Sequence, residues 1–244
     1  KETTAKKKTH PLKTIKTLCR NKYFILITLA FAVIYTSLGL TGGSRIYYAK
    51  YVLGDEMLNS TMTMFNYIPT ILTIMLIPVF TKRFGKIKAL FVGFLFYAAG
   101  LVLEIAGPVN LPMIYTGLVL QGIGHAALYS CLFAIVGDVV DYSEWKDGIR
   151  EEGITYSVTS FGQKIGTGLG TAALGWILAA GHYDGTAAVQ SASAIFAIKG
   201  LFLYLPLVIT VIVLIIWYLF MGIDKIYPTV RKELDERRKN AKQN

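Results

Sequence analysis

The sequence predicts an all-α membrane protein, built as a six-helix transmembrane bundle. Of its 244 residues, 54% are hydrophobic, and the mean hydropathy is +0.50. Such a chain is too apolar for an ordinary soluble domain and long enough for several membrane spans. Its net charge of +10 comes from basic residues placed between the apolar runs. That placement favours orientation in a bilayer over nucleic-acid binding.

Six apolar runs are expected to cross the membrane, and each is long enough to span about 30 Å of hydrocarbon. They cover residues 23–43, 61–80, 89–107, 113–136, 157–180 and 195–221.

The first three spans each carry a feature that sets their packing. Glycines end the first span, which predicts close packing or a break before the aromatic run 46–51, expected to continue the helix to the interface. Pro69 and Pro78 interrupt the second, where proline frees a carbonyl and bends a membrane helix. Glu104 lies near the far end of the third and is expected to reach the interface or a partner.

The fourth span carries Gln121 and His125, which are four residues apart and therefore share a helix face. A lone histidine is more often a packing residue than a ligand, and no Cys, Asp or Glu stands at ligand spacing nearby. We therefore expect no metal site. The sixth span is broken by Pro206. A charged tail follows, and the i, i+4 spacing of its charged residues indicates a helix.

The basic residues orient the bundle. Of the 25, eight lie in residues 1–22, four in the loop after the second span, two after the fourth and seven in the tail. Arg45, Lys50 and Lys199 fall on the other side, and Lys164 lies within a span. By the positive-inside rule, both termini are predicted to be cytoplasmic. The chain then divides into a basic linker (1–22), the six-span bundle (23–222) and a cytoplasmic tail (223–244).

The fifth span contains Lys164, the one basic residue inside an apolar run. At about 100° per residue, it shares a polar stripe with two serines, one glycine and one threonine. The stripe consists of Ser157, Ser160, Lys164, Gly168 and Thr171. A charge at membrane depth usually marks a substrate or ion pathway. The alternative is that Lys164 pairs with a carboxylate only to lock two helices together.

The opposite side of the fifth span carries Gly162, Gly166 and Gly170. This small-xxx-small spacing predicts that another helix packs closely there.

A dense charged segment precedes this span. Asp138 and Asp141 are three residues apart and further acidic residues follow. The basic residues Lys146 and Arg150 lie among them and can pair with them. Such a cluster can form charge-assisted pairs that close a helix bundle on one side. A merely solvated loop is the alternative.

The motifs in this region are similar to those of the glycoside–pentoside–hexuronide:cation symporter family, the melibiose permease-like members of the major facilitator superfamily. They are D-x-x-D-Y-x-E-W-K-x-G-x-R-x-E-G-x-x-Y-S (138–157), S-F-x-x-K-x-G (160–166), G-H-Y (181–183), R-I-Y-Y-A-K-Y-V-L-G-D-E (45–56) and T-K-R-F-G-K (81–86). The resemblance covers nearly the whole chain, but only the C-terminal half of the family's fold of about twelve helices.

This resemblance implies roles for particular residues. Lys164 matches the cavity lysine of the family's eleventh helix, and Ser160 and Thr159 match the polar positions that approach the sugar. With Gln121 and His125 they form our predicted substrate-binding set. The predicted gating charge network consists of Asp138, Asp141, Arg150 and Arg83.

The implied function is half of a secondary active transporter in a bacterial-type cytoplasmic membrane. It would carry a sugar, glycoside or hexuronide with a coupled cation by alternating access, together with an N-terminal half or a second chain. We expect no cofactor, and we expect the coupling cation, Na⁺ or H⁺, to bind mainly in the N-terminal half. A non-transporting membrane scaffold or sensor that keeps the fold is the alternative. An enzyme is not expected, since no nucleophile–base pair or metal constellation stands out.

Overall fold

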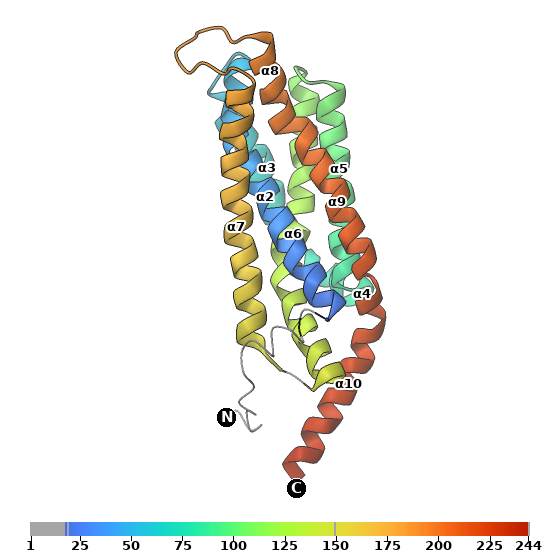
Figure 1. Ribbon diagram of the computed structural model, residues 1–244. Helices are drawn as coiled ribbons and strands as arrows, with labels where there is room; N and C mark the ends of the chain where they lie inside the picture. The colour runs from blue at the N-terminus through green and yellow to red at the C-terminus, as the bar shows by residue number, and fades with distance from the viewer. Residues whose placement is uncertain (1–17, 19, 149, 244) are drawn as a thin grey trace.

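Long apolar segments fold as helices in a membrane because each helix satisfies its own backbone hydrogen bonds. The computed structural model describes residues 18, 20–148 and 150–243, and shows long helices running side by side (Figure 1). The elements are α2 (Lys22–Tyr51), α3 (Leu58–Ile74), α4 (Ile77–Phe84), α5 (Lys86–Ala106), α6 (Leu111–Asp147), α7 (Glu152–Ala180), α8 (Ala192–Lys199), the π-helical turn η1 (Gly200–Tyr204), α9 (Leu205–Phe220) and α10 (Gly222–Gln243).

The described elements run along the bundle in six helical passes, whereas the prediction was of six membrane spans. α2, α5, α6 and α7 are one pass each, α3 and α4 form a pass bent by 55°, and α8, η1 and α9 run continuously. Four helices are long and apolar enough to cross a membrane, and the bent pair makes up to five. α7 has 29 residues, about 43 Å at 1.5 Å per residue, but it is not among the helices with a stretch apolar enough to count as a span.

Two helices are longer than expected. α2 continues through its glycines to Tyr51, so the aromatic run does extend the first helix, and Arg45 lies within it. α6 continues past the predicted end at residue 136 to Asp147, and Gly148 in the left-handed conformation ends it. Asp138 and Asp141 therefore lie on a helix, one turn apart.

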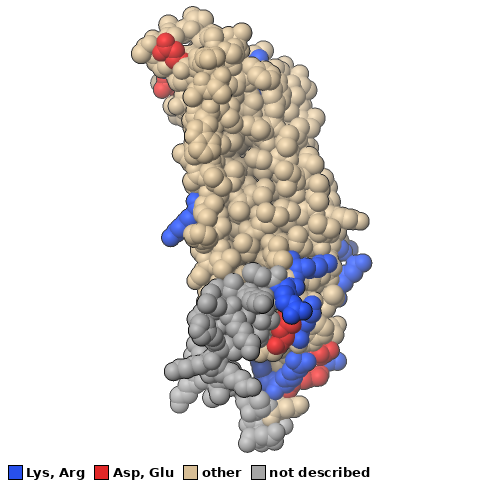
Figure 2. Space-filling view, viewed as in Figure 1, with Lys and Arg blue, Asp and Glu red and all other residues tan. Residues whose placement is uncertain are grey.

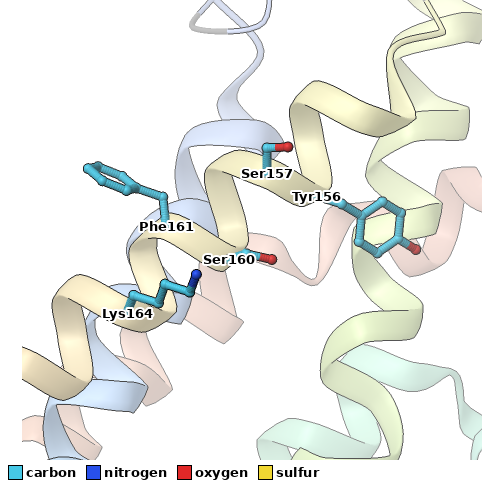
Figure 3. A pocket seen from close by; sticks show the side chains of 5 residues that line it. All are labelled: Tyr156, Ser157, Ser160, Phe161 and Lys164. Atoms are coloured by element: carbon cyan, nitrogen blue, oxygen red, sulfur yellow. The ribbon is translucent and has the colours of Figure 1, made fainter.

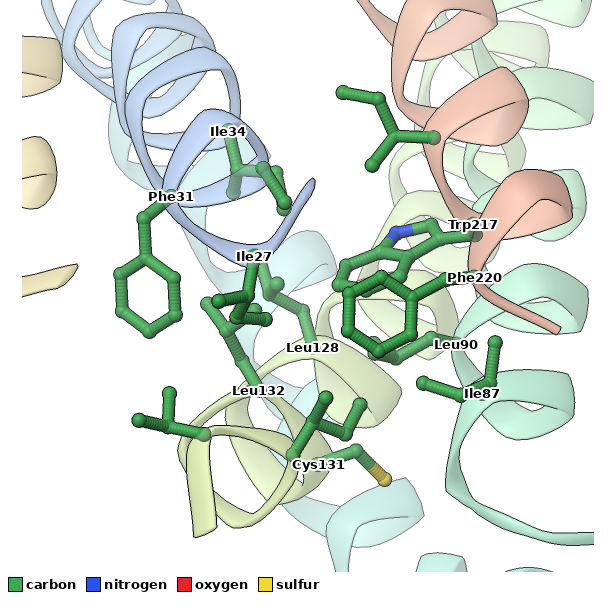
Figure 4. Packing of buried hydrophobic residues seen from close by; sticks show 14 of the residues in the cluster. Ile27, Phe31, Ile34, Ile87, Leu90, Leu128, Cys131, Leu132, Trp217 and Phe220 are labelled. Atoms are coloured by element: carbon green, nitrogen blue, oxygen red, sulfur yellow. The ribbon is translucent and has the colours of Figure 1, made fainter. Parts of the chain in front are cut away.

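The main hydrophobic core joins α2, α5, α6 and α9 (Figure 4). Phe31 of α2 and Trp217 of α9 are fully buried in it, and so are Leu90 of α5 and Leu132 of α6. A second cluster surrounds the buried Tyr48 towards the opposite end of the bundle. Its hydroxyl donates to the carbonyl of Pro108, in the turn between α5 and α6, at 2.5 Å.

The glycine stripe of α7 packs against the backbone of α2, which confirms the predicted close helix contact. A Cβ atom added to Gly166 would overlap the carbonyl oxygen of Ala32, and one added to Gly170 would overlap that of Thr36. From the other side, a Cβ on Gly39 would stand 2.7 Å from the carbonyl oxygen of Thr167. The two backbones thus approach where neither helix has a side chain.

Replacing Gly166 by leucine is expected to separate α7 from α2 and lower stability, because overpacking a tight contact costs on the order of 1–3 kcal/mol or more. The matched control is Gly168→Leu on the opposite side of α7, where nothing lies within 4 Å of an added Cβ. Thermal unfolding of the purified chain in detergent measures the difference. Equal midpoints for the two variants would contradict the packing role.

Candidate functional site

The polar stripe of α7 lines a pocket of about 400 Å³ (Figure 3). Its lining consists of Tyr156, Ser157, Ser160, Phe161 and Lys164. Ser157, Ser160 and Lys164 therefore come together as their helical spacing predicts. Hydroxyl groups can donate and accept, which suits them to polyhydroxylated ligands, while the ammonium adds three donors.

Lys164 is exposed at this pocket. None of the ion pairs among the described residues includes it. Within the part of the chain that the structure describes, Lys164 therefore does not lock two helices through a carboxylate. Charged side chains are rare in the middle of the bundle, as the face in view in Figure 2 shows.

Thr159 does not reach the pocket, contrary to prediction. It is fully buried, on the same side of α7 as the glycine stripe, and its hydroxyl contacts the carbonyl oxygens of Thr155 and Tyr156 in its own helix.

Gln121 and His125 do not join Lys164 either. Both are buried inside the bundle, 5% and 9% exposed. Gln121 donates from Nε2 to Glu104 Oε1 at 2.7 Å, and His125 Nδ1 lies 3.3 Å from Asn66 Oδ1. Glu104 has thus found a partner in the interior, which was one of the two expectations for it.

The sequence reasoning missed the aromatic residues of the pocket. The Tyr156 hydroxyl lies 3.5 Å from the carbonyl oxygen of Phe133 on α6, and the Phe133 ring packs edge-on against Phe31 of α2 at 5.2 Å. Aromatic faces next to hydroxyl groups are well suited to sugar rings, which have apolar faces and polar edges. Tyr156 precedes Ser160 by four residues, so the helical spacing that found Ser160 also marks Tyr156.

The predicted charge cluster at the end of α6 exists, and Arg150 is its centre. Its guanidinium donates to Asp141 at 2.9 Å and to Glu144 at 2.5 Å, and it also binds Glu152. Partial burial opposes the charged form of Arg150, but the hydrogen bonds to Glu144, Asp141 and Glu152 outweigh it and raise the pKa of the guanidinium. Arg150 therefore remains charged and ties the start of α7 to the end of α6.

Asp138 has a different partner from the one expected. Lys86, at the start of α5, donates to both of its carboxylate oxygens at 2.7 and 2.8 Å. Arg83 instead lies over the ring of Phe84, 5.3 Å from its centroid, and forms no ion pair among the described residues. Gly85, with φ of 91°, turns the chain between the two basic residues, which places Lys86 and not Arg83 against α6.

The tail helix α10 closes over the same cluster. Arg238 contacts Glu144 at 2.8 Å, the Tyr227 hydroxyl donates to Asp141 at 3.1 Å, and Trp145 donates to Glu233 at 2.7 Å. Asp224 accepts from the backbone N–H groups of Ile87 and Lys88, and burial raises its pKa. Charged side chains of both signs accordingly gather around α10 (Figure 2).

Six helical passes, a glycine-packed helix pair and a polar pocket on one helix define an integral, multi-pass helical membrane protein. The family model for MFS/sugar transport proteins matches residues 1–225, and the chain belongs to this family. That match agrees with the resemblance carried by the motifs. Because the family is one of transport proteins, the chain is not an enzyme.

Relatives in this family carry names of transporters. The chain is 31% identical to the isoprimeverose transporter of Lactiplantibacillus pentosus over 100% of its own length and 50% of the relative. It is 27% identical to the glucuronide carrier protein homolog of Escherichia coli (strain K12), over 94% of this chain and 50% of the relative. The uncharacterized symporter YjmB of Bacillus subtilis (strain 168) is 26% identical over 91% of this chain and 49% of its own. The chain thus spans about half the length of these relatives.

Proposed function

We propose that this chain is the C-terminal half of a symporter that carries a sugar, glycoside or hexuronide by alternating access. The observation that carries the proposal is the α7 pocket, lined by Ser157, Ser160, Tyr156 and Phe161, in which the Lys164 ammonium points toward Ser160 and forms no ion pair among the described residues. A cation at this depth needs a polar cavity around it. The names of the isoprimeverose and glucuronide relatives support a sugar or glycoside as the ligand class.

A second bundle would complete the cavity, because the described residues supply one wall. An N-terminal six-helix half or a second chain would face α7, bring the carboxylate that pairs with Lys164, and hold most of the site for the coupling cation, Na⁺ or H⁺. In this proposal residues 1–22 link the halves, 23–222 form the bundle and 223–244 form a cytoplasmic tail. The membrane is a bacterial-type cytoplasmic membrane.

Co-expression tests the proposal. The chain is produced with an N-terminal six-span half, encoded by neighbouring sequence or taken from the isoprimeverose transporter, and uptake of a labelled glycoside is followed in cells. We expect accumulation with both halves and none with either alone. Normal insertion of both halves without binding or uptake of any glycoside or hexuronide would favour the scaffold alternative.

Both termini are expected to face the cytoplasm, from the distribution of basic residues. Single cysteines at Asn240 and Asp184, in a chain lacking Cys19 and Cys131, are labelled with an impermeant maleimide. The cysteine at position 184, in the loop after α7, should react in intact cells, and that at position 240 only after permeabilisation. The reverse pattern would invert the topology.

A further inference from the structure

The bundle interior holds a carboxyl group that the transport proposal does not use. Glu104, two residues before the end of α5, is completely buried. Its Oε1 accepts a hydrogen bond from Gln121, and its Oε2 has no hydrogen-bond partner. None of the ion pairs among the described residues includes it. A buried ionised carboxylate in this position is costly, and such a group tends to take up a proton.

The fold makes specific room for this side chain. On α6, a Cβ atom added to Gly117 would stand 2.6 Å from Glu104 Cγ and 2.9 Å from its Oε1. Gly100, one turn earlier on α5, meets the same part of α6 and would overlap Gly117 if it carried a Cβ. The glycines bring α5 and α6 together around the carboxyl group, so the Glu104 side chain cannot turn out towards lipid without separating the two helices.

A guanidinium stands on the other side of the site. Arg45 of α2 donates from Nη1 to Thr63 of α3 at 3.1 Å, and its Nε is buried without a partner. Arg45 and Glu104 each keep one buried polar atom without a hydrogen-bond partner, and they form no ion pair with each other among the described residues. The site thus joins four helices and contains one acid and one base, each with an unsatisfied polar atom.

We propose that Glu104 is a proton-binding site within this bundle. In the protonated form the hydrogen is on Oε2, and Gln121 donates to Oε1. On release the O–H bond breaks, the electron pair stays on Oε2, and a water molecule accepts the proton. The resulting carboxylate is stabilised by Arg45. One carboxyl therefore exchanges one proton, and the attraction between α2 and α5 is strong only in the deprotonated form.

Several titratable and charged side chains of the neighbouring helices surround the site. The titratable and charged groups around the site are Arg45 and Tyr48 on α2, Tyr67 on α3, Tyr97 on α5, His125 and Tyr129 on α6, and Tyr204 on η1. The helices α4 and α9 also pack on α5, and they carry Lys82, Arg83 and Tyr218 near the opposite end of that helix.

Infrared difference spectroscopy of the purified chain in lipid nanodiscs tests the site directly. A carboxylic-acid C=O band should decrease as pH rises and shift in D₂O. It should be absent in Glu104→Gln and return at a changed frequency in Glu104→Asp. Glu56→Gln is the control, since Glu56 is an exposed acid on the loop after α2 whose removal should leave the band intact. Arg45→Gln should raise the midpoint pH by about one unit or more, a tenfold higher proton affinity, because the carboxylate loses its stabilising charge.

Two results would overturn the proposal. One is an unchanged C=O region in Glu104→Gln, which would mean that Glu104 is always ionised. The other is a Glu104 band that neither titrates nor shifts in D₂O, which would mean a permanently neutral structural acid. Should Glu104→Gln fail to fold, the Arg45→Gln midpoint decides, because an unmoved midpoint excludes Glu104 as the titrating group. The measurement requires no transport, so its failure would leave the proposed function untouched.

Discussion

Replacing Lys164 by alanine is expected to abolish concentrative sugar uptake by the assembled transporter while the chain still inserts in the membrane. Lys164 is exposed at the α7 pocket and has no carboxylate partner among the described residues. Its proposed partner lies on the opposite bundle, and removing the ammonium would leave that carboxylate unpaired in a site of low dielectric. Uptake of labelled sugar against a gradient and equilibrium binding are measured separately.

Two further variants serve as a control and as a milder change in the same pocket. Lys225→Ala removes an exposed lysine of α10 with no ion pair among the described residues, and should leave uptake unchanged. Ser160→Ala should weaken sugar affinity without abolishing accumulation, because one lost hydrogen bond is worth about 0.5–1.5 kcal/mol. Full accumulation by Lys164→Ala at normal expression would make Lys164 a residue of packing or of surface charge, and the site assignment would be wrong.

Neutralising Asp138 and Asp141 together is expected to weaken closure at the cytoplasmic end and shift the assembled transporter towards the inward-open state. Asp138 would lose its pair with Lys86, and Asp141 its bonds to Arg150 and Tyr227. A hydrogen bond to a charged group contributes about 1.5–3 kcal/mol of stability. The Asp141–Arg150 pair contributes less than this, because Arg150 is partly exposed to solvent. A total near 1.4 kcal/mol already changes the population ratio about tenfold.

Cysteine accessibility reports this shift. A cysteine at Ser157, which lines the pocket close to the start of α7, should react about tenfold faster with an impermeant maleimide added to inside-out vesicles when Asp138→Asn and Asp141→Asn are combined. Asp147→Asn is the matched control, because this exposed acid at the end of α6 forms no ion pair among the described residues. Equal labelling and equal transport in all three proteins would remove the gate assignment.

Hydropathy and helical spacing predicted the passes and the faces of α7 well, since both depend on the chain's own periodicity. The close contact at the glycine stripe could be predicted without knowing that α2 is the partner, because small residues at i, i+4 and i+8 allow any helix to approach closely. Helix ends were predicted less well. Asp138 and Asp141 are polar enough to suggest a loop, yet α6 continues through them because Lys86 and Arg150 pair with their charges and Tyr227 donates a hydrogen bond to Asp141.

Partners between helices could not be predicted in the same way. Spacing gives the face on which a residue lies, but not which helix faces it. Arg83 and Lys86 are three residues apart, and only the turn at Gly85 determines which one meets Asp138. Thr159 was expected to flank the polar stripe and to match a family position near the sugar, whereas it lies with Gly162 and Gly166 on the packing side. Gln121 and His125 turn inward because Glu104 and Asn66 supply their hydrogen bonds.

The contact between α2 and α7 also bears on how the protein is made. Gly166 is synthesised 134 residues after Ala32, the residue whose carbonyl it meets, so at about 5–20 residues per second the first helix waits on the order of ten seconds for its neighbour. During that interval the face of α2 that later contacts α7 is exposed to lipid. Thr28 and Thr36 on that face donate their hydroxyls to the carbonyl oxygens of Phe24 and Ala32 one turn earlier, so these two donors are satisfied within α2 itself. Insertion can therefore proceed helix by helix, with the α2–α7 contact closing only once α7 has been made and before α9 is added.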